Sequence, residues 1–459
     1  MARHLRSLCG AMFAVAAGLT AAQPGPDPVA QRATQVMQDI ARDARFNGAV
    51  VLMRDGQVVF EQAVGLAQRD PDRAYTVDTP SDGGSLAKTL TAALLHELVA
   101  EGRLNLNDRV ARHLPGYPYP SHTVRDLVSH RTGLPDYDFF DADFKPGQVR
   151  DTKDLVAVLA RRKPPPGLAP GVKVEYANLG FDLAALVAER VTGQRLDTLF
   201  QERYFKPLGM AGAFARPARF ADWPVPRPPG YRFKAGAWQL FDASDGEGFV
   251  GASNVHASAR DWARWGHAFA SAQVMASGSL AAGLREPMLD SGLAYQLTRL
   301  SWYCDASRQR CHYTGSYNGY FAQVYWDSLR REVVAYVSNS SLPPWHWARL
   351  TRDLADALAG RDAAPPDPAQ PKVISAKDRP RYAGRYTAPG LGELVVSSSS
   401  DGRSFVRVGQ GERASLYPAS SSVLYAPTLD LALAFSGPPE AATLHLRSVF
   451  LSVDARRAP

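Results

Sequence analysis

The sequence predicts an α+β domain followed by a small all-β domain, and three observations support this division. A helical pattern and a β-hairpin pattern open the main part of the chain, and strand patterns followed by a helix close it near residue 360. Four prolines then lie among the first eleven residues of the segment 361–380, which indicates a linker. Short Val, Leu, Tyr and Phe runs between Ser-, Gly- and Pro-rich turns fill residues 381–459, as in an all-β domain.

The N-terminus has the pattern of a secretory signal peptide. Arg3 and Arg6 precede an apolar run that ends in small residues before Gln23, so we expect a signal peptide over residues 1–22. An uncleaved anchor is the alternative, but the run is shorter than the ~20 apolar residues that a membrane span needs. We therefore expect a periplasmic or secreted protein without a stable membrane anchor, whose main domain covers residues 29–360.

The charged residues, cysteines and histidines bear on three further expectations: the partner, a disulfide, and a metal or cofactor site. The formal net charge of +7 is spread without a basic run, so nucleic acid is not an expected partner. Cys304 and Cys311 are close enough in sequence to join the two arms of a hairpin by a disulfide in an oxidising compartment, with two free thiols as the alternative. The ten histidines form no His-x-His or His-Glu-x-x-His group, so we expect neither a metal site nor a cofactor.

The elements of the main domain follow from their periodicity. Apolar residues at helical spacing between residues 29 and 40 predict the first helix, and β-branched residues on both sides of Asp55-Gly56 predict the hairpin. The segment 86–98 is helical by pattern. Further helices are predicted in "TVRDLVSH", "DTKDLVAVLARR", "FDLAALVAERVTG" and "SARDWARWGHAFASA". Strands follow from "LSWYC" to "VVAYVSNSS", with a turn at Asn318-Gly319, and a last helix ends at Gly360.

Ser85 and Lys88 form the first candidate for chemistry. At i, i+3 on a helix that begins near Ser85, both side chains lie on one face, about 5–6 Å apart at Cβ. A serine hydroxyl needs a neighbouring base, and a lysine amine serves as that base only when burial or a nearby cation favours its neutral form. A Ser-x-x-Lys also occurs by chance about once or twice in a chain of this length, so the pair is weak by itself.

Two later segments add polar groups. Tyr176 and Asn178 are expected in a loop just before a helix, where a phenol near a lysine relays protons and an amide holds the lysine and a substrate carbonyl. A helix-capping asparagine beside a packed tyrosine is the plainer alternative. Tyr313, Thr314 and Gly315 lead into a strand along which a substrate backbone could lie, although turn requirements alone also explain a hairpin rich in Gly and Tyr.

The three segments in this order resemble the penicillin-recognising serine enzymes, in the branch that groups class C β-lactamases, D-alanyl-D-alanine carboxypeptidases and family VIII esterases. "TVRDLVSHRTGLPDY", "FKPLGMAGAF" and "SARDWARWGHAF" are also similar to segments of that family. The resemblance implies a β-lactamase/transpeptidase-like fold, an antiparallel sheet flanked by helices with an all-helical lobe beside it. It also implies that the C-terminal segment is a small β-barrel-like domain.

The resemblance implies that this chain is a serine hydrolase, with roles carried over from the family. Ser85 would be acylated, Lys88 would deprotonate it, and Tyr176 would pass protons to the leaving group and activate water. Asn178 would orient Lys88 and the substrate carbonyl, and the backbone N–H groups of Ser85 and Ser316 would form the oxyanion hole. The expected partner is a small-molecule or peptide substrate.

Two departures from the family's pattern bear on the substrate. Ala87 stands where the family commonly has Ser or Thr, and Tyr313 stands where it has a Lys or His that pairs with a substrate carboxylate. His312 is next to this position, but on a strand it would point to the opposite face. We therefore expect weak β-lactamase activity at best, and better activity on esters or amides without a terminal carboxylate.

The main alternative is a catalytically impaired relative that binds penicillin or cell-wall peptides. The intact Ser85, Lys88, Tyr176 and Asn178 argue against it, while Ala87 and Tyr313 favour it. An esterase of the α/β-hydrolase fold would need a Gly-x-Ser-x-Gly pentapeptide, and the chain contains none. The sequence predicts neither the natural substrate nor the oligomeric state.

Overall fold

A computed structural model of the chain describes most of its two domains. The described residues are 27–361, except 45, 138–142, 144–146, 173–174, 272, 274–282, 285–286, 291–294, 299, 306 and 342–343, and 379–458, except 390, 400–402, 410–412, 419–422, 427–428, 430, 437–442, 449 and 451. The predicted signal peptide and nearly all of the predicted linker lie outside these residues. No helix of the described part is long and apolar enough to cross a membrane.

The centre of the main domain is an eight-stranded sheet in which both ends of the domain meet. Its strand order is β12-β13-β14-β15-β16-β17-β1-β2, so the first hairpin pairs with the last strand. The strands are β1 (Gly48–Arg54), β2 (Gln57–Val64), β12 (Pro287–Asp290), β13 (Tyr295–Thr298), β14 (Tyr303–Asp305), β15 (Arg310–Tyr317), β16 (Tyr320–Asp327) and β17 (Glu332–Ser338). The predicted turn at Asp55-Gly56 has positive φ at both residues, as a two-residue hairpin of the favoured type requires.

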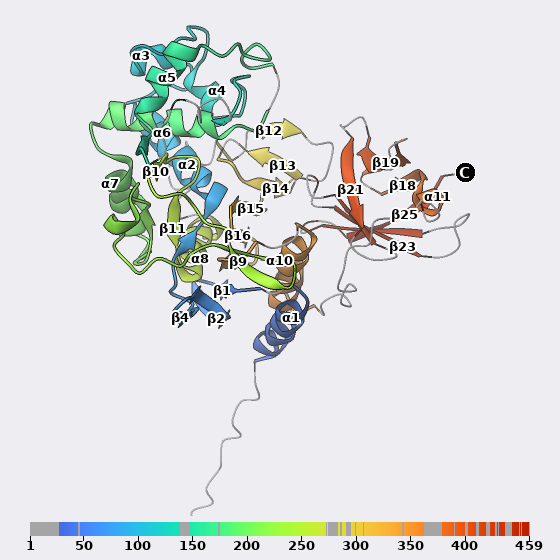
Figure 1. Ribbon diagram of the computed structural model, residues 1–459. Helices are drawn as coiled ribbons and strands as arrows, with labels where there is room; N and C mark the ends of the chain where they lie inside the picture. The colour runs from blue at the N-terminus through green and yellow to red at the C-terminus, as the bar shows by residue number, and fades with distance from the viewer. Residues whose placement is uncertain are drawn as a thin grey trace, which may run out of the picture.

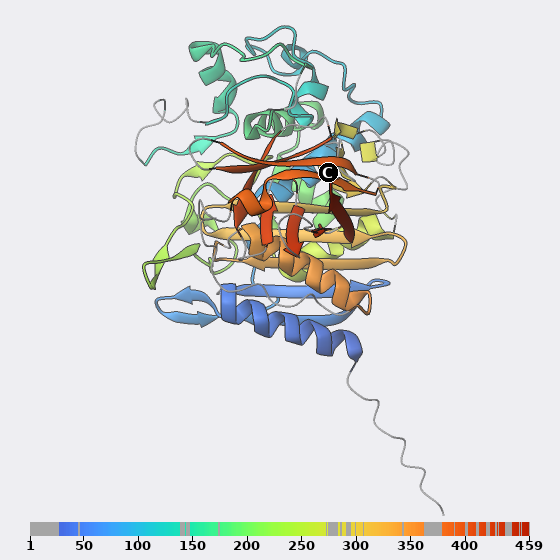
Figure 2. The same cartoon turned by 90° about the vertical axis from the view of Figure 1, so that its right-hand side faces the viewer.

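Helices cover both faces of this sheet (Figures 1 and 2). Alternate residues of β1 face two separate cores: Ala49 and Val51 pack with α2 (Ala87–Ala100) and α8 (Ala259–Ala270), whereas Val50 and Leu52 pack with α1 (Pro28–Ala44) and α10 (Pro344–Leu358). This alternation is the period of two that a strand imposes on its side chains. The central strands of the sheet, such as β1 and β17, are therefore buried on both sides, whereas the edge strand β2 is partly exposed.

The middle of the chain forms the expected helical lobe, at the top of Figure 1. Its helices are α3 (Val110–His113), α4 (Val124–Val128), α5 (Asp154–Arg162), α6 (Asn178–Thr192) and α7 (Leu196–Phe200). A capping box between Thr123 and Asp126 starts α4, and one between Ser258 and Asp261 starts α8. Short strands lie before α2, between α4 and α5, and between α7 and α8: β3 (Leu66–Arg69), β4 (Asp72–Ala74), β5 (Ser81–Asp82), β6 (Arg150–Asp151), β7 (Phe214–Ala215), β8 (Tyr231–Lys234), β9 (Ala237–Leu240), β10 (Glu247–Gly248) and β11 (Val255–Ala257).

The C-terminal domain is a closed eight-stranded barrel preceded by α11 (Arg379–Tyr382). Its strands are β18 (Gly384–Ala388), β19 (Gly392–Ser398), β20 (Ser404–Val408), β21 (Ala414–Pro418), β22 (Val423–Ala426), β23 (Leu431–Ser436), β24 (Thr443–Arg447) and β25 (Ser452–Arg457). Inward residues such as Leu394, Val406 and Leu433 fill its interior. The predicted all-β domain is thus a barrel, in which closure leaves no free sheet edge.

The barrel contacts the sheet on the side of α1 and α10 (Figure 2). Phe450 packs on Tyr325 of β16 and on His312 of β15, with ring centroids 6.3 and 5.2 Å apart. Tyr425 of the barrel contacts Trp347 of α10. These contacts are on the sheet face opposite to α2, so the barrel supports β15 from behind.

Candidate active site

The turn that carries Ser85 is built from residues that allow close backbone packing. Gly84 has a φ of +50° and begins the short helix η1 (Gly84–Leu86), which leads directly into α2. Its N–H donates to Asp82 Oδ1 at 2.7 Å. A Cβ on Gly83 would lie 2.3 Å from the Trp262 ring, so only glycine fits there. The helix that the sequence predicts over residues 86–98 is observed as the end of η1 followed by α2, and Ser85 lies in η1 just before it.

Ser85 lies within hydrogen-bond distance of two potential bases. Its Oγ is 2.6 Å from the Tyr176 hydroxyl and 3.1 Å from Lys88 Nζ, which donates to it. Ser85 is partly exposed and Tyr176 is 51% exposed, so a ligand can reach both. A nucleophile with a base in contact and an open side is the arrangement that acyl transfer requires.

Lys88 is fully buried and held by three acceptors. Besides Ser85 Oγ, Nζ donates to Asn178 Oδ1 at 2.7 Å and to the Ala252 carbonyl at 2.9 Å. The Ala252 N–H in turn donates to Asp182, whose carboxyl also accepts from the Tyr137 hydroxyl. Burial raises the pKa of Asp182 to about 7, against the effect of these hydrogen bonds and of the Lys88 charge.

Asp136 is a site residue that the sequence reasoning missed. It accepts from the Asn178 and Leu179 N–H groups at 3.0 and 3.2 Å with one oxygen, and from Asn178 Nδ2 at 2.8 Å with the other. Asn178 is the first residue of α6 rather than a loop residue, and Asp136 caps the helix in its place. The motif "GLPDY" has no local pattern that marks this aspartate, because its partner is 42 residues away.

The Tyr176 ring is supported by His130. The two rings stack with centroids 4.6 Å apart at 28°, and Lys88 Nζ lies 4.9 Å from the centre of the Tyr176 ring. His130 is 2% exposed, and burial, together with the Lys88 charge, lowers its pKa to about 3. His130 is therefore a neutral, planar support at ordinary pH.

Strand β15 brings the third segment to the nucleophile. A Cβ on Gly315 would lie 1.6 Å from the Gly83 carbonyl oxygen and 3.0 Å from Ser85 N, so the two backbones are in direct contact. The exposed Ser316 follows Gly315 on the strand. This contact places the Ser316 and Ser85 backbones side by side, as two oxyanion-hole donors require.

Tyr313, at the position where a cation was expected, is buried with 3% exposure. Burial, together with the neighbouring hydroxyl groups of Tyr176 and Tyr303, raises the pKa of Tyr313 well above its ordinary value. His312 lies on the opposite face, between Gln323 and Phe450. The Thr314 hydroxyl donates to Gln323. Tyr313 therefore occupies the position at which the family has a Lys or His, which we call the Tyr313 slot. His312 does not reach this slot.

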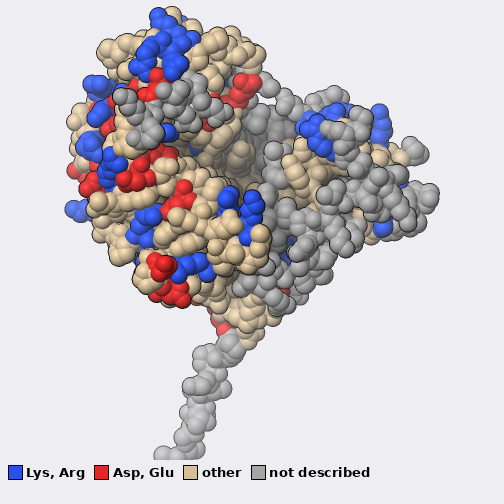
Figure 3. Space-filling view, in the orientation of Figure 1, with Lys and Arg blue, Asp and Glu red and all other residues tan. Residues whose placement is uncertain are grey.

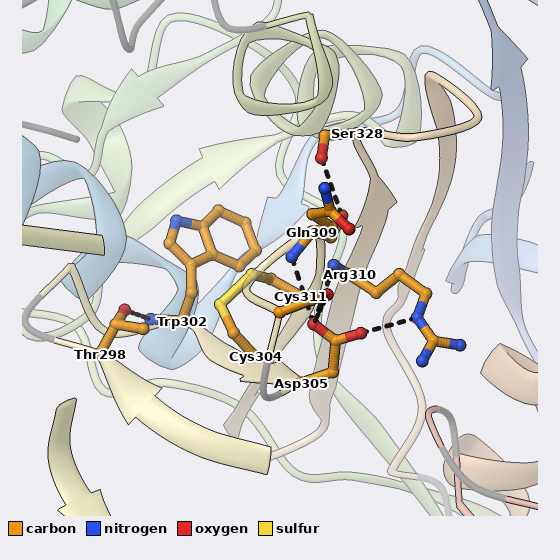
Figure 4. The surroundings of a disulfide bond; sticks show 9 residues. Thr298, Trp302, Cys304, Asp305, Gln309, Arg310, Cys311 and Ser328 are labelled. Atoms are coloured by element: carbon orange, nitrogen blue, oxygen red, sulfur yellow. Dashed lines mark hydrogen bonds and ion pairs between the residues drawn. A yellow bond between two sulfur atoms is a disulfide. The ribbon is translucent and has the colours of Figure 1, made fainter. Parts of the chain in front are cut away.

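The predicted disulfide between Cys304 and Cys311 is present and joins β14 to β15 (Figure 4). Both cysteines are fully buried. Near them Asp305 accepts from Arg310 Nε at 2.9 Å and Trp302 N–H donates to the Thr298 hydroxyl at 3.2 Å. The two strands are thus bound together just before Tyr313.

The molecular surface of Figure 3 carries Lys or Arg and Asp or Glu side by side on the main domain, with a hollow between the helical lobe and the barrel. Among the described residues, no group of three or more His, Cys, Asp or Glu is placed to hold a metal ion.

Comparison with known proteins identifies similar chains. The family model described as Beta-lactamase matches residues 29–359. Penicillin-binding protein 4* of Bacillus subtilis is 22% identical over 424 residues, 89% of this chain and 94% of that protein. A D-aminopeptidase of Brucella anthropi is 34% identical over 174 residues, 36% of this chain and 32% of that protein. The octameric penicillin-binding protein homologue from Pyrococcus abyssi superposes with a TM-score of 0.64 at 18% identity, covering 94% of this chain and 100% of that one.

Proposed function

The chain belongs to the beta-lactamase family, and on that premise we propose that it is an exported serine hydrolase that cleaves an ester or amide through an acyl-enzyme on Ser85. The observation that carries this proposal is the position of Ser85 Oγ, 2.6 Å from the Tyr176 hydroxyl and 3.1 Å from the buried Lys88 amine. A structural serine would not need both groups at hydrogen-bond distance in a partly exposed site.

The reaction divides into acylation and hydrolysis. Ser85 Oγ attacks the substrate carbonyl carbon while its proton passes to the neutral, amine form of Lys88, and the N–H groups of Ser85 and Ser316 stabilise the oxyanion. The carbonyl–heteroatom bond then breaks, and Tyr176 returns a proton to the departing oxygen or nitrogen. Tyr176 next takes a proton from the water that attacks the acyl-enzyme. The bond between Ser85 Oγ and the acyl carbon then breaks, and the proton that Lys88 took up during acylation returns to Ser85 Oγ as the acid leaves.

The character of the Tyr313 slot limits the substrate. Tyr313 is buried and neutral, so this position offers no positive charge to a carboxylate. We therefore propose esters or amides without a carboxylate at this position as substrates, with weak β-lactamase activity. The similarity to a D-aminopeptidase supports a peptide-like amide as the substrate. That similarity covers about a third of the D-aminopeptidase.

Intact-mass spectrometry tests the proposal against the alternative of a penicillin- or peptide-binding relative. The mature protein is incubated with a fluorophosphonate and, separately, with a labelled penicillin, with Ser85→Ala as the control. A penicillin adduct on Ser85 that forms and then disappears supports an enzyme. An adduct that persists supports the binding relative, and no adduct with either reagent would contradict both.

A further inference from the structure

We propose that Tyr303 forms an aromatic wall for the leaving group of the substrate, and that the Cys304–Cys311 disulfide holds Tyr303 in that position. This inference rests on the proposed function and deepens it, because it names the class of leaving group: aromatic rather than carboxylate-bearing or alkyl.

The location of Tyr303 follows from the short ladder between β14 and β15. Only two residue pairs form this ladder, Tyr303 with His312 and Cys304 with Cys311. The disulfide therefore fixes the pair next to Tyr303, which is the first residue of β14. Beyond this point, Tyr313 to Tyr317 of β15 have no partner on β14, so Tyr303 stands at the end of the open strand edge that leads to Ser316.

The ring of Tyr303 lies against the Tyr313 slot. Its centroid is 5.7 Å from that of Tyr313 at an interplanar angle of 16°, a stacked arrangement. Tyr313 is almost fully buried, whereas Tyr303 is partly exposed. A ligand at this end of the site therefore meets Tyr303, with the buried Tyr313 behind it.

The position of Tyr176 explains why the leaving group would lie next to Tyr303. The Tyr176 hydroxyl, which in the proposed reaction donates the proton to the leaving group, hydrogen-bonds Ser85 and lies within electrostatic reach of both Tyr313 and Tyr303. The departing atom must be within reach of that hydroxyl, so a leaving group that extends from it along β15 meets the stacked rings of Tyr303 and Tyr313.

A flat apolar wall favours a flat leaving group. Aromatic rings that stack in this way gain a modest attraction beyond simple burial, which corresponds to roughly 2- to 10-fold in kcat/KM. A carboxylate in the same place would lose its hydrating water molecules without finding a positively charged partner.

Two acetate esters with the same acyl group but different leaving groups test the inference: 2-naphthyl acetate and trifluoroethyl acetate. Both give one acyl-enzyme, so hydrolysis of that intermediate is common to them. Tyr303→Leu is expected to lower kcat/KM for the naphthyl ester roughly 2- to 10-fold and to change that for the alkyl ester less than about 2-fold. Tyr303→Phe keeps the ring and should restore the ratio, and Tyr417→Leu on the barrel surface is the control for loss of an exposed tyrosine.

The disulfide is tested by the double variant Cys304→Ser with Cys311→Ser, which should shift the naphthyl-to-alkyl ratio in the same direction as Tyr303→Leu. An equal loss on both esters, or no loss on either, would overturn the role of Tyr303.

A measurement without turnover separates this result from failure of the proposed function. 2-Naphthol binding to Ser85→Ala, followed by fluorescence, should weaken when Tyr303→Leu is added, and equal affinity would contradict the inference even if neither ester is cleaved.

Discussion

Asp136 holds Asn178 by two different groups, the backbone N–H at 3.0 Å and the side-chain Nδ2 at 2.8 Å. Because a carboxylate only accepts, Asn178 must present its NH2 to Asp136 and its Oδ1 to Lys88. Asp136 therefore selects the orientation of the amide that accepts a hydrogen bond from Lys88 Nζ.

Asp136→Asn is expected to lower the acylation rate about 10- to 100-fold, the effect of losing one hydrogen bond to a charged group. The new side chain still has an oxygen to cap α6, but its NH2 faces Asn178 and favours the inverted amide, which no longer accepts from Lys88. The measurement is the rate of fluorophosphonate labelling of Ser85, with thermal unfolding as the control for folding. Labelling at the wild-type rate would show that Asp136 serves only as a helix cap.

Tyr313→Lys is expected to raise benzylpenicillin turnover about 10- to 100-fold, because an ammonium group at this position would pair with the substrate carboxylate. Tyr313→Met, which is of similar length but uncharged, is the matched control and should show no such gain. Fluorophosphonate labelling of Ser85 verifies that each variant is intact. Efficient penicillin hydrolysis by the wild type would contradict the interpretation of the slot.

His130 should reduce stability in acid. Its pKa is about 3 when folded and near 6.5 in the unfolded chain, so the unfolded state binds the extra proton first as pH falls below 6.5. This loss of stability should accumulate down to about pH 3. Between pH 7.5 and 5, the wild type should lose about 2 kcal/mol relative to His130→Phe, which keeps a ring under Tyr176.

Urea unfolding of both proteins at the two pH values measures this difference. The esterase rate at pH 7.5 shows whether the substituted ring still supports Tyr176. Parallel losses in the two proteins would mean that His130 does not titrate as its burial implies.

Removing the disulfide should destabilise the main domain by about 2–3 kcal/mol, as expected for a short closed loop whose cysteines are seven positions apart. The double variant Cys304→Ser with Cys311→Ser is compared with the wild type by urea unfolding, with and without dithiothreitol. Reductant should lower the stability of the wild type toward that of the variant and leave the variant unchanged. Equal stability of all four samples would show that the bond contributes nothing measurable.

Several elements could be predicted because their signals are local. The helix after Ser85, the hairpin at Asp55-Gly56 and the strand alternation of β1 follow from periodicity and turn chemistry. The proximity of Ser85 and Lys88 follows from helix geometry alone. The disulfide was predictable because its cysteines lie on the two arms of one hairpin.

The remaining features depend on contacts between distant segments, and the sequence alone could not place them. Asp136 meets Asn178, His130 supports Tyr176, and Phe450 of the barrel packs behind β15, each through side chains many residues apart. Such pairs leave no periodic pattern. The sequence by itself therefore determined which residue types enter the site and in what order, and the resemblance suggested their roles. Only the tertiary structure decided that Tyr313 rather than His312 occupies the slot, because strand alternation applies only once β15 is known to be regular at these residues. It also decided that Tyr303 stacks on Tyr313, because that contact depends on the pairing of β14 with β15.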